Sequence, residues 1–366
     1  MILVGGKQIA EGQDILHELL EHPVLVSSAA AFVALPGQHI QPPPDENGVS
    51  TDGHGREHRK FVYVGQRECA TVDPDVVEFI GTDDATTCIG VVIRNPQSGL
   101  TCVGHLDFVN GVKLGINQMT GSVSPTSSCL LEAHLVGGFD DLVDRKKKFS
   151  MFASSGKRRR SSKDPKKPEG YSRPLARRIL EELQSSSCNF NLQTLCILQH
   201  NTAVGSNGFA HPIAYGFVVE SKIGRLAPAT FHIDARCPDG VVRSLCLLTI
   251  SSNPNYGAEL MTPYKTSEDS FAIGPTRWSD NHVQFAEYAL EQEDSWFLEK
   301  TSTSPYAEGP DFLTSSRRMY AYLLEHPNWE QTFPGDSPRV FTRSNLGGWD
   351  RQLIQSQLEQ CMPQRK

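Results

Sequence analysis

Cys88 and His105 lie on either side of a predicted β-hairpin, and a thiol next to an imidazole can carry out nucleophilic catalysis. Two β-rich runs flank the turn-forming stretch 95–99. With a loop over 95–98, Cys88 faces His105 directly, with Cβ atoms about 5 Å apart. The same register predicts a second face that is core, formed by Ile89, Val91, Ile93, Leu100, Cys102 and Leu106. A one-residue slip would break this pairing, so the prediction depends on the length of the loop.

A partner imidazole is expected to raise the thiolate fraction of a cysteine whose pKa is otherwise near ~8.5. The imidazole can then protonate a leaving amine and later activate water. Thr82 or Asp107 could orient its second nitrogen. The alternative is that Cys88 is an ordinary buried cysteine, as we expect for Cys102, Cys196 and Cys246 in their apolar runs.

Four blocks of the sequence resemble one known family. The segment Gly81-Thr82-Asp83-Asp84-Ala85-Thr86-Thr87-Cys88 resembles the region around the catalytic cysteine of protein N-terminal asparagine amidohydrolases. Residues 131–139, 273–278 and 302–308 resemble further blocks of that family, so the resemblance spans about 61–330. The spacing of Cys88 and His105 also resembles the bacterial chemotaxis-receptor glutamine deamidases. In these a Thr six residues before the Cys completes a triad, and Thr82 matches it.

The resemblance implies deamidation of N-terminal asparagine to aspartate on proteins and peptides, with release of ammonia. The product would then be arginylated and degraded through an N-degron pathway. Cys88 would form a thioester and His105 would shuttle protons, while the Cys88 N–H and Thr87 stabilise the oxyanion. Neither a metal nor an organic cofactor is required.

Selecting a chain terminus requires recognition of the α-ammonium, which a carboxylate achieves most directly. Asp83, Asp84 and Glu308 are the candidates. The alternatives are that the two aspartates cap a turn and that Glu308 is a solvated charge. Glu132 and His134 share a strand face, but without a third ligand at suitable spacing we expect His134 to be structural and no metal site to form.

Composition narrows the class of protein. The chain has 366 residues and a net charge of −7, which argues against a nucleic-acid partner. No apolar stretch reaches the length of a membrane span, and no secretory signal is seen. Nine cysteines without metal spacing favour a reducing compartment. We therefore expect a cytoplasmic monomer, with the nucleus as a further location because residues 157–160 read Lys-Arg-Arg-Arg.

The pattern of elements indicates an α+β fold, with mixed or antiparallel β-sheets flanked by helices and the active-site Cys and His on a β-hairpin. We expect one catalytic domain with an N-terminal part at 1–35, an exposed loop at 36–60, a core with the hairpin at 61–144 and a remainder at 168–345. The basic segment 145–167, with eleven Lys or Arg and one acid, is expected to be a disordered insertion of a plant-type member, and 346–366 a C-terminal tail. Helices are expected at 14–21, 174–184 and 310–326, and strands at 2–4, 195–198, 213–220 and 244–250.

Three other functions remain open. An N-terminal glutamine amidase differs by one methylene, which is worth only about 1–3 kcal/mol in an apolar pocket. Another Cys–His acyl-transfer enzyme, such as a peptidase or a transglutaminase-like transferase, uses the same two groups. A non-catalytic interaction protein would use the basic segment 145–167 to bind acidic partners.

Overall fold

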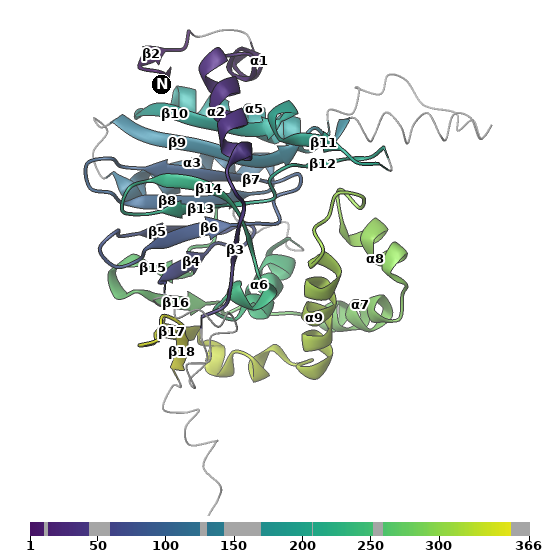
Figure 1. Cartoon of the computed structure of the whole chain (residues 1–366). Coiled ribbons are helices and arrows are strands. Elements are labelled where there is room, and N and C mark those ends of the chain that lie inside the picture. The colour runs from purple at the N-terminus through teal and green to yellow at the C-terminus, as the bar shows by residue number, and fades with distance from the viewer. Residues whose placement is uncertain are drawn as a thin grey trace, which may run out of the picture.

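The computed structural model describes residues 1–10, 14–43, 59–124, 130–142, 170–206, 208–251 and 259–352. Within them the chain forms a seven-stranded, a five-stranded, a four-stranded and a two-stranded sheet, with helices around them (Figure 1). The predicted α+β class is therefore confirmed. The expected insertion 145–167 lies outside the described residues, as do most of the loop 36–60 and of the tail 346–366.

The seven-stranded sheet is mixed. Its order is β2 (Lys7–Gln8), β1 (Ile2–Val4), β10 (Asn189–Leu198), β9 (Leu130–Phe139), β7 (Ile89–Arg94), β8 (Thr101–Leu106) and β5 (Cys69–Val72). Strands β1, β10 and β9 run parallel to one another, whereas β7 is antiparallel to both β9 and β8. The predicted hairpin is thus an interior part of a larger sheet.

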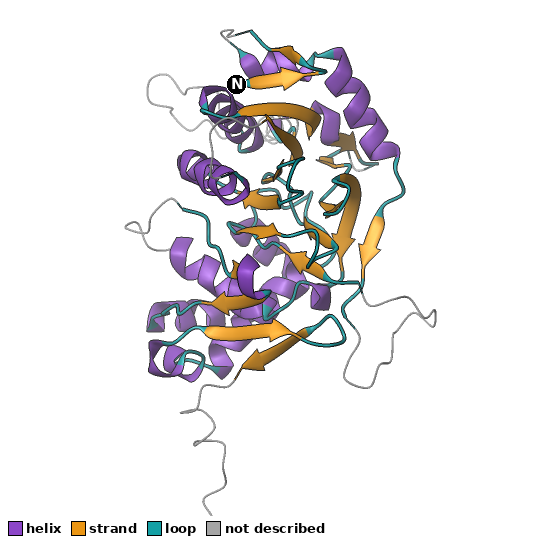
Figure 2. Ribbon diagram, turned by 90° about the vertical axis from the view of Figure 1, so that its left-hand side faces the viewer, coloured by secondary structure: helices purple, strands orange, loops and turns teal. Residues whose placement is uncertain are grey.

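One face of this sheet is covered by α1 (Ile15–Leu20), α3 (Val112–Val123) and α5 (Ser172–Ser185) (Figure 2). Helix α5 confirms the predicted helix 174–184, and its apolar positions Leu175, Ile179, Leu180 and Leu183 are buried. Their spacing of three to four residues gives the helix a continuous apolar stripe. The residues predicted to form the core face of the hairpin pack into the same core.

A five-stranded sheet packs on the other face of the seven-stranded sheet. Its order is β3 (Gln38–Ile40), β14 (Arg225–Phe231), β13 (Phe217–Glu220), β6 (Phe79–Thr82) and β4 (Phe61–Tyr63). Val92 and Val103 from the first sheet meet Ile80 and Phe217 from the second. Helix α2 (Pro23–Ala34), which was not predicted, contributes to the same core. Helices, one sheet and a second sheet therefore form three layers.

The C-terminal part adds a sheet and several helices. The four-stranded sheet contains β15 (Tyr264–Lys265), β16 (Ser270–Ile273), β17 (Arg339–Arg343) and β18 (Trp349–Gln352). The helices are α6 (Gly240–Ser251), α7 (Asp280–Leu290), α8 (Asp294–Thr301) and α9 (Phe312–Glu325), and α9 confirms the predicted helix 310–326. A short ribbon of β11 (Thr202–Val204) and β12 (Ala210–Pro212) completes the fold.

The strand predicted at 244–250 is wrong, because these residues belong to helix α6. An apolar run of this length fits a strand or a buried helix equally well. In the structure Val242, Leu245, Cys246, Thr249 and Ile250 are buried at helical spacing. Burial of these side chains against the rest of the protein stabilises the helix over the strand.

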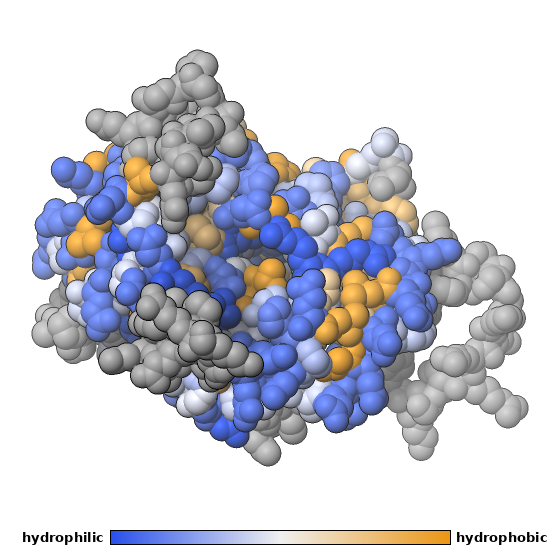
Figure 3. Space-filling view, turned by 90° about the horizontal axis from the view of Figure 1, so that it is seen from below, coloured by the Kyte–Doolittle hydropathy of each residue, from blue (hydrophilic) through white to orange (hydrophobic). Residues whose placement is uncertain are grey.

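Hydrophilic side chains cover much of the face seen in Figure 3, and apolar ones gather there in separate patches. None of the described helices combines the length and apolar character needed to cross a membrane.

Candidate active site

Cys88 lies in a bend directly before β7 rather than inside a strand. The neighbouring strand β9 approaches this bend through Gly137, whose φ is +119°, and a Cβ on Gly137 would come within 2.7 Å of the Cys88 carbonyl oxygen. Only glycine suits both this conformation and this close approach. Phe139 N–H also donates to the Thr86 carbonyl at 3.0 Å, so β9 supports the backbone of the bend.

His105 is on β8, where it pairs with Gly90 and not with Cys88. The predicted direct Cys88–His105 pairing is therefore wrong by two residues. The loop runs from Asn95 to Leu100 instead of ending at Ser98, and it is closed by a bond from Asn95 N–H to the Leu100 carbonyl. Side chains in a strand alternate between the two faces of the sheet, so a shift of two residues leaves each side chain on its predicted face. His105 therefore lies on the same face as Gly90.

The imidazole of His105 is held by Thr82. Thr82 Oγ1 lies 2.7 Å from His105 Nδ1, and both side chains are buried. Thr82 ends β6 of the five-stranded sheet, whereas His105 is on the seven-stranded sheet, so this bond joins the two layers. His105 Nε2 is buried without a hydrogen-bond partner among the described residues. The ring is thus oriented at one nitrogen and free at the other.

Asp107, the alternative orienting group for the imidazole, is committed elsewhere. Arg67 donates to both of its carboxylate oxygens at 3.1 Å, and Gln66 donates to one of them at 3.0 Å. This leaves Thr82 as the residue that contacts the His105 ring.

Burial favours the neutral forms of both the Cys88 thiol and the His105 imidazole. Burial lowers the pKa of His105 to about 4, although Asp107 and Glu68 oppose this shift. Burial also raises the pKa of the Cys88 thiol well above its usual value, and the charges of Asp107 and Glu308 act in the same direction. The expectation of a raised thiolate fraction is therefore not met in the resting structure. A neutral thiol can still be activated if the imidazole removes its proton during attack.

Thr87 connects the bend at Cys88 to the block 302–308. Its Oγ1 lies 2.9 Å from Thr303 Oγ1, and it hydrogen-bonds to the Cys88 sulfur, where it favours the thiolate. The two segments are far apart in sequence, and this contact brings the block 302–308 to the bend at Cys88.

Asp83 is fully engaged inside the protein. It accepts hydrogen bonds from Tyr63 OH at 3.0 Å, from Phe231 N–H at 2.7 Å and from Arg236 Nη2 at 3.0 Å, and its side chain is 1% exposed. Burial raises its pKa, and Arg236 and the hydrogen bonds oppose the shift. Such a carboxylate fixes the loop and has no free oxygen to offer a ligand.

Asp84 is partly exposed. Its backbone has a φ of +57° and 34% of its side chain is exposed, and its carboxylate converges with that of Asp83 on the guanidinium of Arg236. Arg236 Nη1 lies 2.6 Å from its Oδ2, and burial together with Asp83 raises its pKa. Gly309 packs close to Oδ1, since a Cβ there would lie 3.3 Å away. Asp84 is thus an accessible carboxylate next to the block 302–308.

Glu308 is held in place by two serines. Ser302 Oγ donates to its Oε1 over a short distance, and Ser304 Oγ donates to the same oxygen at 3.3 Å. Burial raises its pKa, and its charge in turn raises the pKa of both Cys88 and Asp84. Glu308 therefore lies close enough to Cys88 and Asp84 for its charge to act on both.

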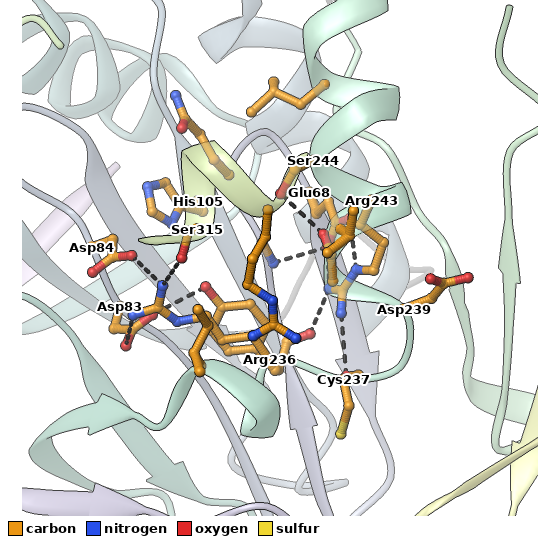
Figure 4. Close-up of a pocket in the computed structure, with 18 of the residues that line it drawn as sticks. Glu68, Asp83, Asp84, His105, Arg236, Cys237, Asp239, Arg243, Ser244 and Ser315 are labelled. Carbon is orange, nitrogen blue, oxygen red and sulfur yellow. Dashed lines mark hydrogen bonds and ion pairs between the residues drawn. The ribbon is translucent and has the colours of Figure 1, made fainter. Parts of the chain in front are cut away.

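Sequence analysis missed Arg236, which organises this end of the site. It contacts Asp83, Asp84 and Asp311 and comes from a segment about 150 positions beyond the two aspartates. Arg236, the two aspartates and His105 line a cavity of about 390 Å³ (Figure 4). No local pattern marks this arginine, because its partners are assembled only by the tertiary fold.

Glu132 and His134 have structural partners. His134 Nδ1 lies 3.1 Å from Thr194 Oγ1, and Glu132 accepts from Arg94 at 3.1 Å. Burial, assisted by Arg94, lowers the pKa of His134 to about 4. This confirms the expected structural histidine, and the described residues contain no cluster of three potential metal ligands.

Comparisons with known proteins identify the family of this chain. The family model described as "Protein N-terminal asparagine amidohydrolase" matches residues 52–351. The protein of that name from Arabidopsis thaliana is 37% identical over 96% of this chain and 100% of its own length. Its namesakes from Sus scrofa and Homo sapiens are 30% and 29% identical, over 95% and 96% of this chain and 96% and 97% of theirs. The higher identity to the Arabidopsis relative agrees with the plant-type expectation. The chain belongs to the protein N-terminal asparagine amidohydrolase family.

Proposed function

We propose that this chain hydrolyses the side-chain amide of an N-terminal asparagine on proteins and peptides, giving aspartate and ammonia. The observation that carries the proposal is the imidazole of His105, fixed at Nδ1 by Thr82 and unpartnered at Nε2, on the strand that pairs with the segment following Cys88. The name that the relatives share supports the side-chain amide of an N-terminal asparagine as the bond that is hydrolysed.

In the first step, Cys88 Sγ attacks the carboxamide carbon while its proton passes to His105 Nε2. The resulting oxyanion would be stabilised by the Cys88 N–H and by the hydroxyl of Thr87. The C–N bond then breaks, and the proton on Nε2 leaves with the amine as ammonia. A thioester remains on Cys88.

In the second step, His105 removes a proton from water, which attacks the thioester carbon. The C–S bond breaks, the thiol recovers a proton, and an N-terminal aspartate is released. Thr82 contributes at both steps because its bond to Nδ1 stabilises the imidazolium that forms in between. The chemistry uses the side chains of this chain and water.

Asp84 and Glu308 would bind the substrate's α-ammonium. Burial raises the pKa of each carboxyl group, and the charge of Glu308 raises that of Asp84 further, so a bound cation would stabilise the charged form of both. Asp83 would act indirectly, since it anchors Arg236 and thereby positions Asp84.

The reaction product would be an N-terminal aspartate, the form that is arginylated in an N-degron pathway. The substrates would be cytoplasmic proteins, or nuclear proteins if the basic residues 157–160 direct import. The enzyme would act as a monomer.

The proposal is tested by mass spectrometry of peptides that begin with Asn, Gln or acetyl-Asn, together with an assay for released ammonia. We expect only the free Asn peptide to gain the mass of an amide-to-acid conversion. Cys88→Ala should abolish the reaction, whereas Cys246→Ala, which removes a buried thiol of helix α6, should retain it. Conversion of the Gln peptide alone would favour a glutamine amidase, and cleavage of the main chain without ammonia would favour a peptidase.

A further inference from the structure

Tyr215 has a phenol hydroxyl next to the candidate site. Its side chain is half-buried, and none of the described residues hydrogen-bonds to its hydroxyl. Only its backbone is fixed, by a bond from Ala85 N–H to the Tyr215 carbonyl at 2.8 Å. The hydroxyl is not one of the buried polar atoms that lack a partner, so it reaches solvent and is available to a ligand.

The fold places Tyr215 directly beside the candidate site. Strand β13 pairs with β6 so that Phe217 is opposite Thr82. One residue earlier, a Cβ on Gly216 would lie 2.5 Å from Asp83 Cα and 2.2 Å from the Thr82 carbonyl oxygen. Glycine is therefore required there, and the backbone at Tyr215 runs against the segment that carries the two aspartates.

The electrostatic surroundings keep this phenol protonated. Burial raises the pKa of Tyr215, and the charges of Glu308 and Asp84 raise it further. Tyr215 thus lies within the field of both carboxylates proposed to bind the α-ammonium, and at neutral pH it presents an O–H donor there.

The substrate atoms next to the α-ammonium determine which acceptor the Tyr215 hydroxyl can bind. In an N-terminal asparagine, the carbon that carries the ammonium also carries the carbonyl of the first peptide bond. Asp84 and Glu308 already supply acceptors for the ammonium, so the group still without a partner at that end of the substrate is this carbonyl oxygen.

We propose that the Tyr215 hydroxyl donates a hydrogen bond to the first main-chain carbonyl oxygen of the substrate, and so positions the N-terminal residue for attack by Cys88. This role rests on the proposed deamidation. In this role Tyr215 binds the peptide backbone of the substrate, whereas Cys88 and His105 act on the side-chain carboxamide.

The test compares Tyr215→Phe with wild type on two substrates. One is a peptide that begins with Asn; the other is β-alaninamide, which keeps the ammonium and the carboxamide but lacks the main-chain carbonyl. We expect Tyr215→Phe to lower kcat/KM for the peptide about 3- to 10-fold, mainly through KM, because one neutral hydrogen bond is lost. For β-alaninamide kcat/KM should be unchanged. Tyr288→Phe, at an exposed tyrosine of helix α7, is the matched control and should behave as wild type with both.

Binding to a catalytically inactive protein gives a second readout. In a Cys88→Ala background, Tyr215→Phe should raise the Kd of the Asn peptide by a similar factor in calorimetry. An equal loss with both substrates through kcat, with unchanged Kd, would overturn the proposal and assign the hydroxyl to the oxyanion. Unchanged kinetics and Kd would show that Tyr215 has no role in binding. If wild type releases no ammonia from Asn peptides, the proposed deamidation itself fails.

Discussion

Replacing Thr82 with valine tests the central feature of the site, the bond between Thr82 Oγ1 and His105 Nδ1. Valine has nearly the same shape as threonine but cannot accept or donate a hydrogen bond. The bond is 2.7 Å long and both side chains are buried, so water cannot replace the lost hydroxyl easily. The ring would keep its place in the core and lose the group that fixes its tautomer.

The expected loss follows from the charge that develops on the ring. At rest the imidazole is neutral, and a hydrogen bond to a neutral group contributes about 0.5–1.5 kcal/mol. When the ring takes the thiol proton it becomes charged, and the same bond then contributes about 1.5–3 kcal/mol. Only the difference between these two contributions, about 1–1.5 kcal/mol, is lost from catalysis. Since each ~1.4 kcal/mol is tenfold in rate, kcat should fall about tenfold. Thr82→Ser, which keeps the hydroxyl, should retain most of the activity.

The protein offers a matched control in another buried threonine–histidine pair. Thr194 Oγ1 lies 3.1 Å from His134 Nδ1, this histidine is also buried, and burial lowers its pKa to about 4 as well. Thr194→Val should therefore destabilise the fold about as much as Thr82→Val, as measured by thermal unfolding, while kcat stays unchanged. Full kcat in Thr82→Val, or an equal loss of kcat in Thr194→Val, would refute the reasoning.

Three further outcomes are expected. Alkylation of Cys88 by iodoacetamide should keep accelerating above pH 9, because burial raises the pKa of its thiol; a plateau below pH 8 would instead reveal a stable thiolate. Asp83→Asn should lower the unfolding midpoint in urea because it removes a buried partner of Arg236, whereas Asp84→Asn should keep the fold and raise KM for Asn peptides; the reverse pattern would exchange their roles. His134 has a folded pKa of about 4, below its unfolded value near 6.5, so its contribution to stability is complete above pH 6.5 and is lost as pH falls toward 4. The loss amounts to about 3 kcal/mol. His134→Gln should flatten the dependence of the unfolding free energy on pH over this range, and an unchanged slope would contradict the assignment.

Local patterns were sufficient for several elements. The alternation of apolar residues along 89–93 and 100–106 predicted the two hairpin strands and the face that became core. Helical spacing predicted α5 and α9. These succeed because a strand or an amphipathic helix buries a face that its own sequence defines. The same reasoning failed at 244–250, where an apolar run fits either structure.

The hairpin register shows where local information ends. Turn residues at 95–99 indicated a loop but did not fix its length, and the actual loop is longer by two residues. Since side chains in a strand repeat every two residues, the faces survived this error and the direct Cys88–His105 pairing did not.

The sequence by itself placed Cys88 and His105 on one hairpin and offered Thr82 or Asp107 as the partner of the imidazole, because the apolar alternation and the turn residues are local features. Only the tertiary structure decided which contacts these residues make. It joined Thr82 and His105 across two sheets and brought Arg236, Tyr215 and Glu308 from distant segments to the candidate site. It also engaged Asp83 fully in internal hydrogen bonds and left Asp84 partly accessible. It also set the charge states, since the pKa values of Cys88 and His105 depend chiefly on burial, which is a property of the packed molecule and not of any local run of residues.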